Sequence, residues 1–158
     1  MSTALTQSAP TAALPSLRPG KRVAIVKTLW NATVVDALCE GAAKLLDGED
    51  VAYTIYNVPG AVELTYAAAR LSNSYDAVIV LGCVIRGGTP HFDYVCQSVT
   101  QGVTQLNAAG RVPVIFGVLT VDCLQDALDR AGGSLGNKGT EAAEAAIHMI
   151  DFSDKTHS

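Results

Sequence analysis

Apolar residues along this chain form short unbroken runs that alternate with longer stretches of helical spacing. The clearest run is Ala77–Ile85, in which apolar and polar positions do not alternate. We therefore expect a central parallel strand that is buried on both faces. Two glycines end the run, and apolar residues then resume at Phe92, Val95, Val99, Val103 and Leu106. This spacing predicts a helix that runs to Ala109, with Thr89 as its N-cap and Pro90 as its first residue.

The same patterns predict three more strands, each followed by a helix. The expected strands span residues 22–28, 51–58 and 112–121, where β-branched residues are frequent. The helices that follow them are expected to end near Gly48, Leu71 and Ala131.

The C-terminal part of the chain has fewer apolar landmarks. Asp122 is the expected cap of the helix after the last strand. Gly132, Gly133 and Gly136 predict a flexible loop, and a final helix then runs from about Asn137 to Ile150. Residues 152–158 are mostly polar and are expected to form a tail.

Strands that alternate with helices predict an α/β fold with one parallel sheet and helices on both faces. Ligands of such sheets bind beyond the carboxyl ends of the strands, at a topological switch point. Trp30, Glu63 and the turn 87–91 all fall at those ends. Patterns typical of dinucleotide sites, P-loops and the GxSxG nucleophile elbow do not occur in the sequence.

Composition narrows the possible functions. The chain has 158 residues, of which 49% are hydrophobic and 16% charged, and its net charge is −4. This length fits one domain, expected at residues 21–151. No apolar run reaches the ~18–20 residues that cross a bilayer, so a membrane partner is not expected. The acidic balance also argues against nucleic-acid binding.

The cysteines and the N-terminal segment suggest where the protein works. Cys39, Cys83, Cys96 and Cys123 lie within apolar patterns and form no C-x-x-C pair. We expect buried free thiols, no metal, and a reducing cytoplasmic compartment. Residues 1–20 lack the pattern of a secretory signal. We expect them to be flexible or to be ordered by a neighbouring chain.

The turn at 87–91 combines two features that suggest chemistry. Gly87 and Gly88 would let an anion approach the backbone, where N–H groups of a helix start point at it. His91 would stand beside that anion site, and an imidazole can give and take protons at neutral pH. The local pattern is equally compatible with a tight turn that carries a surface histidine.

Three further residues also have both a structural and a functional interpretation, and a fourth, Lys138, has a functional one. Trp30 is either a core aromatic or a stacking surface for a planar ring. Glu63 either favours a helix start or accepts hydrogen bonds from ligand hydroxyls. Arg130 either complements a helix end or binds an anion. Lys138 opposes the dipole of the last helix, which suggests that it contacts a polar ligand.

Four stretches of the sequence together resemble the lumazine synthase family. They are VPGAVEL at 58–64, GCVIRGGTPHFDYV at 82–95, FGVLT at 116–120 and RAGGSLGNKG at 130–139. The resemblance covers about residues 20–150. It implies a three-layer α/β/α sandwich with a flavodoxin-like four-stranded parallel sheet.

The family is a transferase of riboflavin biosynthesis. It condenses 5-amino-6-(D-ribitylamino)uracil with 3,4-dihydroxy-2-butanone 4-phosphate to 6,7-dimethyl-8-ribityllumazine, releasing inorganic phosphate and water, without cofactor or metal. The resemblance implies that Trp30 stacks on the pyrimidine, that Glu63 accepts the ribityl hydroxyls, and that His91, Arg130 and Lys138 are catalytic. The substrate-binding positions that it implies are Trp30, Asn31, Ala61, Val62, Glu63, Cys83, Val84, Ile85, Gly88, Thr89, Phe116, Arg130 and Lys138.

The resemblance also implies which residues of this set bind the phosphate and which one transfers protons. Gly88 and Thr89 would hold the phosphate, with Arg130 as its cationic partner. His91 would shuttle protons during Schiff-base formation, phosphate elimination and ring closure. Val62 stands where the family typically has an aromatic residue, which thins one wall of the ribityl pocket.

Phe116 is expected in the middle of a strand, too far from the strand ends to reach a site in its own chain. The resemblance implies that it enters the site of the adjacent subunit in a homopentamer. The short connection at 132–138 matches the form found in icosahedral 60-mers, so we expect a shell rather than a free pentamer. The alternative to an enzyme is a non-catalytic relative, which binds flavin or lumazine or only builds a shell.

Overall fold

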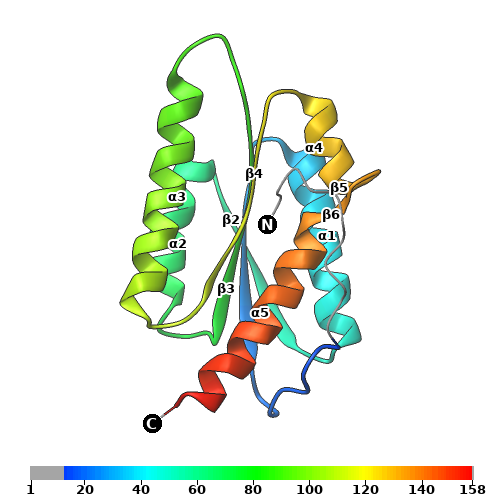
Figure 1. Ribbon diagram of the computed structural model, residues 1–158, viewed down its shortest axis with the longest axis vertical. Coiled ribbons are helices and arrows are strands. Elements are labelled where there is room, and N and C mark those ends of the chain that lie inside the picture. The colour runs from blue at the N-terminus through cyan, green and yellow to red at the C-terminus, as the bar shows by residue number, and fades with distance from the viewer. Residues whose placement is uncertain (1–12, 158) are drawn as a thin grey trace.

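The computed structural model describes residues 13–157, and the chain folds as an alternation of strands and helices (Figure 1). The strands are β1 (Arg22–Thr28), β2 (Ala52–Val58), β3 (Ala77–Ile85), β4 (Val114–Val121), β5 (Ala131–Gly133) and β6 (Gly136–Asn137). The helices are α1 (Ala32–Gly48), the 3₁₀ turn η1 (Ala61–Glu63), α2 (Leu64–Leu71), α3 (His91–Ala109), α4 (Leu124–Arg130) and α5 (Lys138–Lys155).

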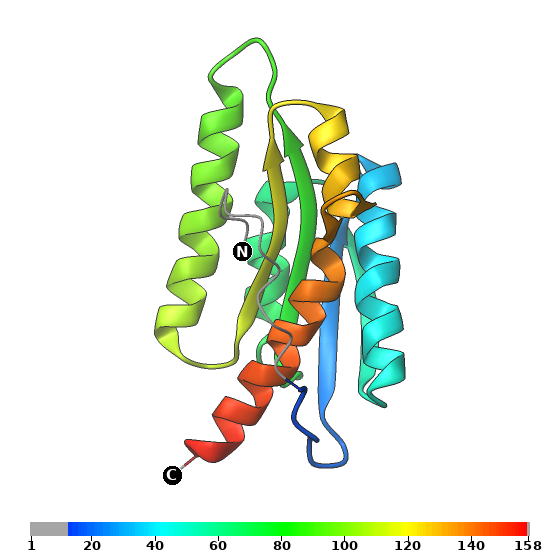
Figure 2. The same cartoon turned by 45° about the vertical axis from the view of Figure 1, so that its right-hand side comes forward.

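Four parallel strands form the central sheet in the order β2-β1-β3-β4. Helices α1, α4 and α5 cover one face, and α2 and α3 cover the other (Figures 1 and 2). This is the three-layer, flavodoxin-like α/β/α arrangement that the sequence predicts. The strand order reverses between β1 and β3, and that point is where ligands of such sheets bind.

Strand β3 lies in the middle of the core. Residues 77–81 of β3 are completely buried and alternate between the two hydrophobic clusters that flank the sheet. The prediction of a strand buried on both faces is therefore confirmed. Burial of each such aliphatic side chain contributes about 1.5–3 kcal/mol to stability.

The α1 and α5 helices approach each other closely where α5 begins. A Cβ atom on Gly139 would lie 1.8 Å from the carbonyl oxygen of Leu38 in α1. Asn137 reinforces this contact, because its Nδ2 donates to the Ala37 carbonyl at 3.0 Å. Its Oδ1 also accepts hydrogen bonds from the Gly139 and Thr140 amides at the helix start. These contacts fix Lys138, the first residue of α5, against the side of α1.

Two predicted helix starts differ from the structure. Helix α3 begins at His91 with Pro90 as its N-cap residue, so Thr89 caps nothing and Pro90 is not the first helical residue. Cys123, not Asp122, is the N-cap residue of α4. The Asp122 carboxylate instead accepts a hydrogen bond from Arg86. The Asp122 side chain therefore binds a residue of a different loop instead of capping the helix that follows it.

The glycine-rich region after α4 is ordered, contrary to the prediction of a flexible loop. Ala131 leaves the helix and begins a short antiparallel hairpin, in which β5 pairs with β6. Gly132 and Gly136 both have positive φ, which glycine adopts without strain in such a turn. The last helix continues through Lys155 rather than ending at Ile150. Ion pairs hold this extra turn: Asp154 pairs with Lys21 at 2.8 Å, and Lys155 pairs with Asp151 at 2.8 Å.

The N-terminal prediction falls mostly on residues 1–12, which lie outside the described part of the chain. Residues 13–18 belong to no helix or strand. Leu14 and Leu17 within this range are partly buried against the cluster under α1 and α5.

Candidate functional site

Trp30 lies at the carboxyl edge of the sheet, just after β1. The amides of Leu29 and Trp30 donate to the carbonyls of Val58 and Pro59, at 2.8 and 3.2 Å, which ties this turn to the end of β2. The indole covers Gly60, where a Cβ atom would lie 2.5 Å from the ring. Because 66% of its surface is exposed, the core interpretation of Trp30 is wrong.

Asn31 connects the same turn to the end of β3. It adopts a left-handed conformation with φ of 58°, which Asn tolerates better than most residues. Its Nδ2 donates to the Cys83 carbonyl at 2.8 Å. The ends of β1, β2 and β3 are therefore joined through Trp30 and Asn31, around the switch point of the sheet.

The cysteines do not share one environment. Cys39 and Cys83 are buried free thiols, but Cys96 is half-buried and Cys123 is exposed, which contradicts the prediction for these two. Burial raises the pKa of the Cys83 thiol to about 11. This thiol is therefore protonated at neutral pH. Because Cys83 is only 6% exposed, a ligand would meet its backbone rather than its thiol.

The short turn η1 lies next to Trp30 at the same edge of the sheet. Ala61 is half-buried, and Val62 is 48% exposed. Glu63 ends η1 directly before α2 rather than lying within that helix. Its Oε2 lies 3.4 Å from where a Cβ of Gly60 would stand, next to the Trp30 ring. The Glu63 carboxylate makes no hydrogen bond with residues 13–157, so its oxygens are available to a ligand.

The β3–α3 turn completes this edge. Val84 and Ile85 are half-buried at the end of β3, and residues 86–91 are exposed. A Cβ atom on Gly87 or Gly88 would meet nothing within 4 Å. No side chain caps α3. The Asp93 amide donates to the Pro90 carbonyl at 3.0 Å, whereas the amides of His91 and Phe92 have no partner within residues 13–157 and remain available. The strand, the glycine turn and the helix follow one another in the predicted order, and His91 is exposed at the first position of α3.

Arg130 and Lys138 lie elsewhere in the fold. Arg130 ends α4, and its Nη1 donates to the Asp126 carbonyl at 2.8 Å. Lys138 begins α5 and pairs with Glu141, at 3.0 Å. Within residues 13–157, no hydrogen bond or ion pair joins either residue to the β3–α3 turn. The hairpin between them lies on the α1 side of the sheet, whereas α3 covers the opposite face (Figure 1).

Phe116 is also separated from the carboxyl edge. It lies on the edge strand β4 and pairs in register with Val80. Val80 precedes Ile85, the last residue of β3, by five positions, or about 16 Å of strand. The ring is 41% exposed, so the interpretation of Phe116 as a core aromatic is wrong.

Two residues at this edge have no role in the sequence prediction. Gly60 accommodates the Trp30 indole, and Arg86 makes contacts from the end of β3 to both Asp93 and Asp122. Both lie inside or beside the quoted family stretches. Their contacts depend on loops that are far apart in the sequence, so no local pattern could have identified them.

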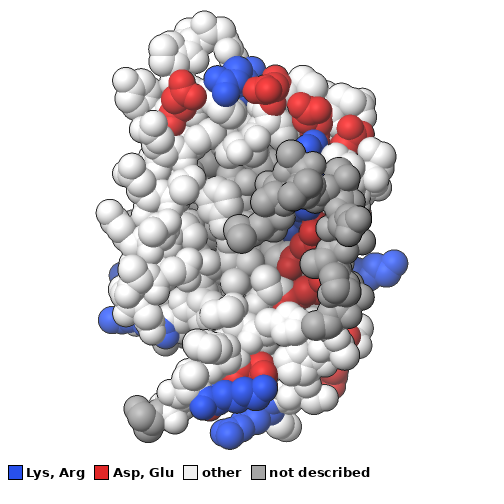
Figure 3. Space-filling view, viewed as in Figure 1, with Lys and Arg blue, Asp and Glu red and all other residues white. Residues whose placement is uncertain are grey.

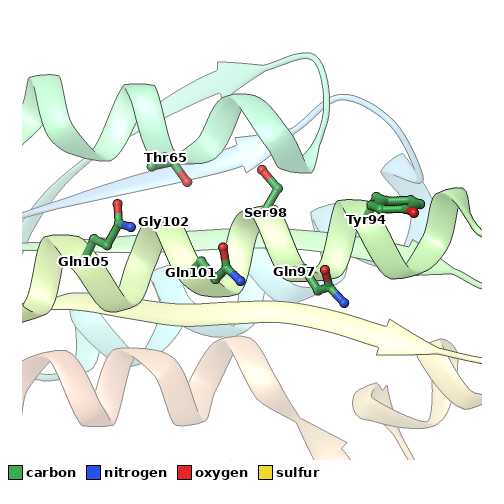
Figure 4. Close-up of a pocket in the computed structure, with 7 residues that line it drawn as sticks. All are labelled: Thr65, Tyr94, Gln97, Ser98, Gln101, Gly102 and Gln105. Carbon is green, nitrogen blue, oxygen red and sulfur yellow. The ribbon is translucent and has the colours of Figure 1, made fainter.

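A groove on the surface of the molecule lies away from these residues. It runs along α3, where Gln97, Gln101 and Gln105 follow one another, and Thr65 of α2 faces them (Figure 4). None of the predicted site residues lines this groove. Within the described residues, no three His, Cys, Asp or Glu side chains form a possible metal site. None of the helices at 13–157 has the length and apolar character needed to cross a membrane.

Comparison with known proteins gives one consistent family. The family model described as 6,7-dimethyl-8-ribityllumazine synthase matches residues 20–154. A protein of that name from Bacteroides fragilis is 51% identical over 133 residues, which cover 81% of this chain and 93% of the relative. One from Micrococcus luteus is 53% identical over 135 residues, covering 84% and 85%.

Among solved structures, a flavodoxin from the domain Archaea is 13% identical and covers 80% of this chain and 99% of its own. Its TM-score is 0.35. A likeness at that score does not establish the fold, which is assigned from the strand order and the helix layers described above.

Proposed function

The chain belongs to the 6,7-dimethyl-8-ribityllumazine synthase family, and we propose that its active site lies at the carboxyl edge of the sheet around the β3–α3 turn. It is a transferase that condenses 5-amino-6-(D-ribitylamino)uracil with 3,4-dihydroxy-2-butanone 4-phosphate to the ribityllumazine, with release of phosphate and water. The observation that supports this site best is the junction of three strand ends through Trp30, Asn31 and Cys83.

The pyrimidine substrate binds on the Trp30 side of this edge. Its ring stacks on the exposed indole, which Gly60 supports from behind. The ribityl chain extends along Ala61 and Val62 towards the Glu63 carboxylate, which accepts hydrogen bonds from its hydroxyls. Backbone groups of Cys83, whose thiol is buried, meet the uracil.

Val84 and Ile85 continue that backbone edge towards the phosphate cradle, which we define as Gly88, Thr89 and the first turn of α3. The phosphate of the butanone substrate binds at Gly88 and Thr89, where the uncapped start of α3 offers N–H groups and a favourable dipole. His91 is the first residue of that helix and therefore lies beside the bound substrate. It transfers protons as the substrate amine forms a Schiff base, as phosphate leaves, and as the ring closes.

Phe116, Arg130 and Lys138 come from a neighbouring subunit. Two observations support this assignment: Phe116 lies about 16 Å from the end of β3, and the other two residues lie beside α1. A head-to-tail contact between copies repeats until a ring closes, and we propose a pentamer. The Arg130 guanidinium of one subunit then neutralises the phosphate held by the next.

We further propose that pentamers assemble into an icosahedral 60-mer. The compact hairpin between α4 and α5 supports this, since it leaves no insertion at that connection. The protein works in the cytoplasm, where free thiols such as those of the four cysteines persist.

The direct test mixes both substrates with purified protein and follows the lumazine chromophore together with free phosphate. The expected result is formation of both products at a rate well above the reaction without protein. A protein that binds the lumazine but leaves this rate unchanged is a non-catalytic relative, and that outcome would contradict the proposal.

A further inference from the structure

Arg86 directly follows β3 at the carboxyl edge of the sheet, between the β3–α3 turn and the β4–α4 loop. Its backbone amide donates to the Val121 carbonyl at 2.9 Å, which extends the pairing of β3 and β4 by one step. Its Nε donates to Oδ1 of Asp122 at 2.8 Å, on the loop between β4 and α4. Figure 3 shows basic surface flanked by acidic surface at this end of the molecule.

The other side of the Arg86 guanidinium faces the first turn of α3. Its Nη1 lies 3.7 Å from Oδ1 of Asp93. Its Cζ lies 4.4 Å from the centroid of the Phe92 ring, a cation–π distance. Phe92 directly follows His91, so one side chain connects the β4–α4 loop to the helical turn that carries the catalytic histidine.

The backbone between these two anchors has little support of its own. Gly87 and Gly88 have open space around their Cα atoms, and glycine is the residue with most conformational freedom. Thr89 is exposed and does not cap α3. The position of the turn relative to the sheet therefore depends on what holds its two ends.

We propose that Arg86 is a positioning residue: it clamps the first turn of α3 to the β4–α4 loop and so fixes the phosphate cradle and His91. This inference rests on the proposed function of that turn. Two carboxylates, those of Asp93 and Asp122, already face the guanidinium. Arg86 is therefore not the cation that binds the substrate phosphate.

The test is a double-mutant cycle with Arg86→Gln, Asp122→Ala and the double variant. Asp122 caps no helix, and exposed ion pairs add little to stability, so all three variants should fold like the wild type. We expect each single variant to lower kcat/KM for the butanone phosphate about 3–10-fold, since small misplacements of reacting groups are costly. The double variant should lose no more than Arg86→Gln alone, and KM for the ribitylaminouracil should stay unchanged.

Two controls accompany the cycle. Arg86→Lys keeps the charge but not the fork geometry, and its activity should lie between those of the wild type and Arg86→Gln. Lys155→Gln removes a cation from an exposed pair with Asp151 at the far end of the molecule and should behave like the wild type.

A direct phosphate contact by Arg86 predicts the opposite pattern. Asp122→Ala would then free the guanidinium and leave KM for the butanone phosphate unchanged or lower, while Arg86→Gln raised it. That result, additive losses, or no loss in either variant would overturn the inference.

Hydrogen exchange gives a readout that does not need activity. The amides of Arg86, Asp93 and Tyr94 are hydrogen-bonded at the two ends of the turn. They should exchange faster in Arg86→Gln and in Asp122→Ala, while those of α1 stay unchanged. Unchanged exchange at the turn would overturn the clamp even in an active enzyme. Faster exchange in a protein that makes no lumazine would instead leave the clamp standing and reject the proposed function.

Discussion

At the scale of single residues, the exposed aromatic side chains are the most informative. Tryptophan normally buries most of its large apolar surface, yet Trp30 is 66% exposed while its turn is held by backbone hydrogen bonds. Such a side chain contributes little to the core and is free to bind a planar ring. Its exposure could not be deduced from the sequence, which predicts its position but not the direction of its ring.

We expect Trp30→Ala to weaken binding of the pyrimidine substrate and to leave the fold intact. Loss of an aromatic pair costs about 0.5–1.5 kcal/mol beyond the lost burial, so KM for the ribitylaminouracil should rise roughly 10-fold. Trp30→Phe should keep most of the affinity. Steady-state kinetics at saturating butanone phosphate would measure both, and an unchanged KM in Trp30→Ala would remove the stacking role.

We expect His91→Ala to lower kcat about 10-fold or more, from the usual contribution of general acid–base catalysis. Some activity should remain, because holding two substrates together accelerates their reaction by itself. His148→Ala is the matched control, since His148 is an exposed histidine on α5. Equal kcat values for the two variants would exclude His91 from the mechanism.

At the scale of elements, the sequence predicts the strands and the last residues of α1, α2 and α3 well. It misplaces the starts of α3 and α4 and the end of α5. The boundaries of β1 and β3 agree with the prediction because buried β-branched runs are local signals. The predicted start of α4 was wrong, because the Asp122 side chain pairs with Arg86 on another loop instead of capping the helix. The hairpin at 131–137 was missed because glycines indicate flexibility and conformational need equally well.

The close contact of α1 with α5 gives a stability prediction at this scale. Gly139→Ala would place a methyl group 1.8 Å from the Leu38 carbonyl oxygen, so the helices must separate. Overpacking of this kind costs about 1–3 kcal/mol or more. Gly48→Ala is the control, because a Cβ there meets nothing within 4 Å and alanine favours the helix. Thermal or urea unfolding should show a clear loss for Gly139→Ala only, and equal stabilities would contradict this description of the contact.

At the scale of the whole molecule, one chain holds only part of the proposed site. The sequence places Phe116 in mid-strand, and the register with Val80 shows how far it lies from the strand ends. The separation of Arg130 and Lys138 from the β3–α3 turn could not be predicted, because it depends on how α4, the hairpin and α5 fold back beside α1. The family resemblance assigns Phe116 to the adjacent subunit, but it identifies Arg130 and Lys138 without indicating which copy supplies them.

The proposed assembly predicts the mass in solution. Light scattering should give a particle far larger than five chains if pentamers close into a shell, since one ring contact alone stops at the ring. A mass near five chains would reject the shell but keep the shared site. A mass near one chain would reject both.

The most direct test of the shared active site is complementation between two impaired variants. His91→Ala and Arg130→Ala chains are unfolded, mixed in equal amounts and refolded together, and lumazine formation is measured. If neighbouring subunits supply the two residues, about a quarter of the sites in mixed rings contain both intact side chains, and activity should recover to about that fraction of wild type. The same variants mixed without unfolding should stay impaired. If the co-refolded mixture is no more active than the average of the two variants, each site is built within one chain, and the proposed shared active site is wrong.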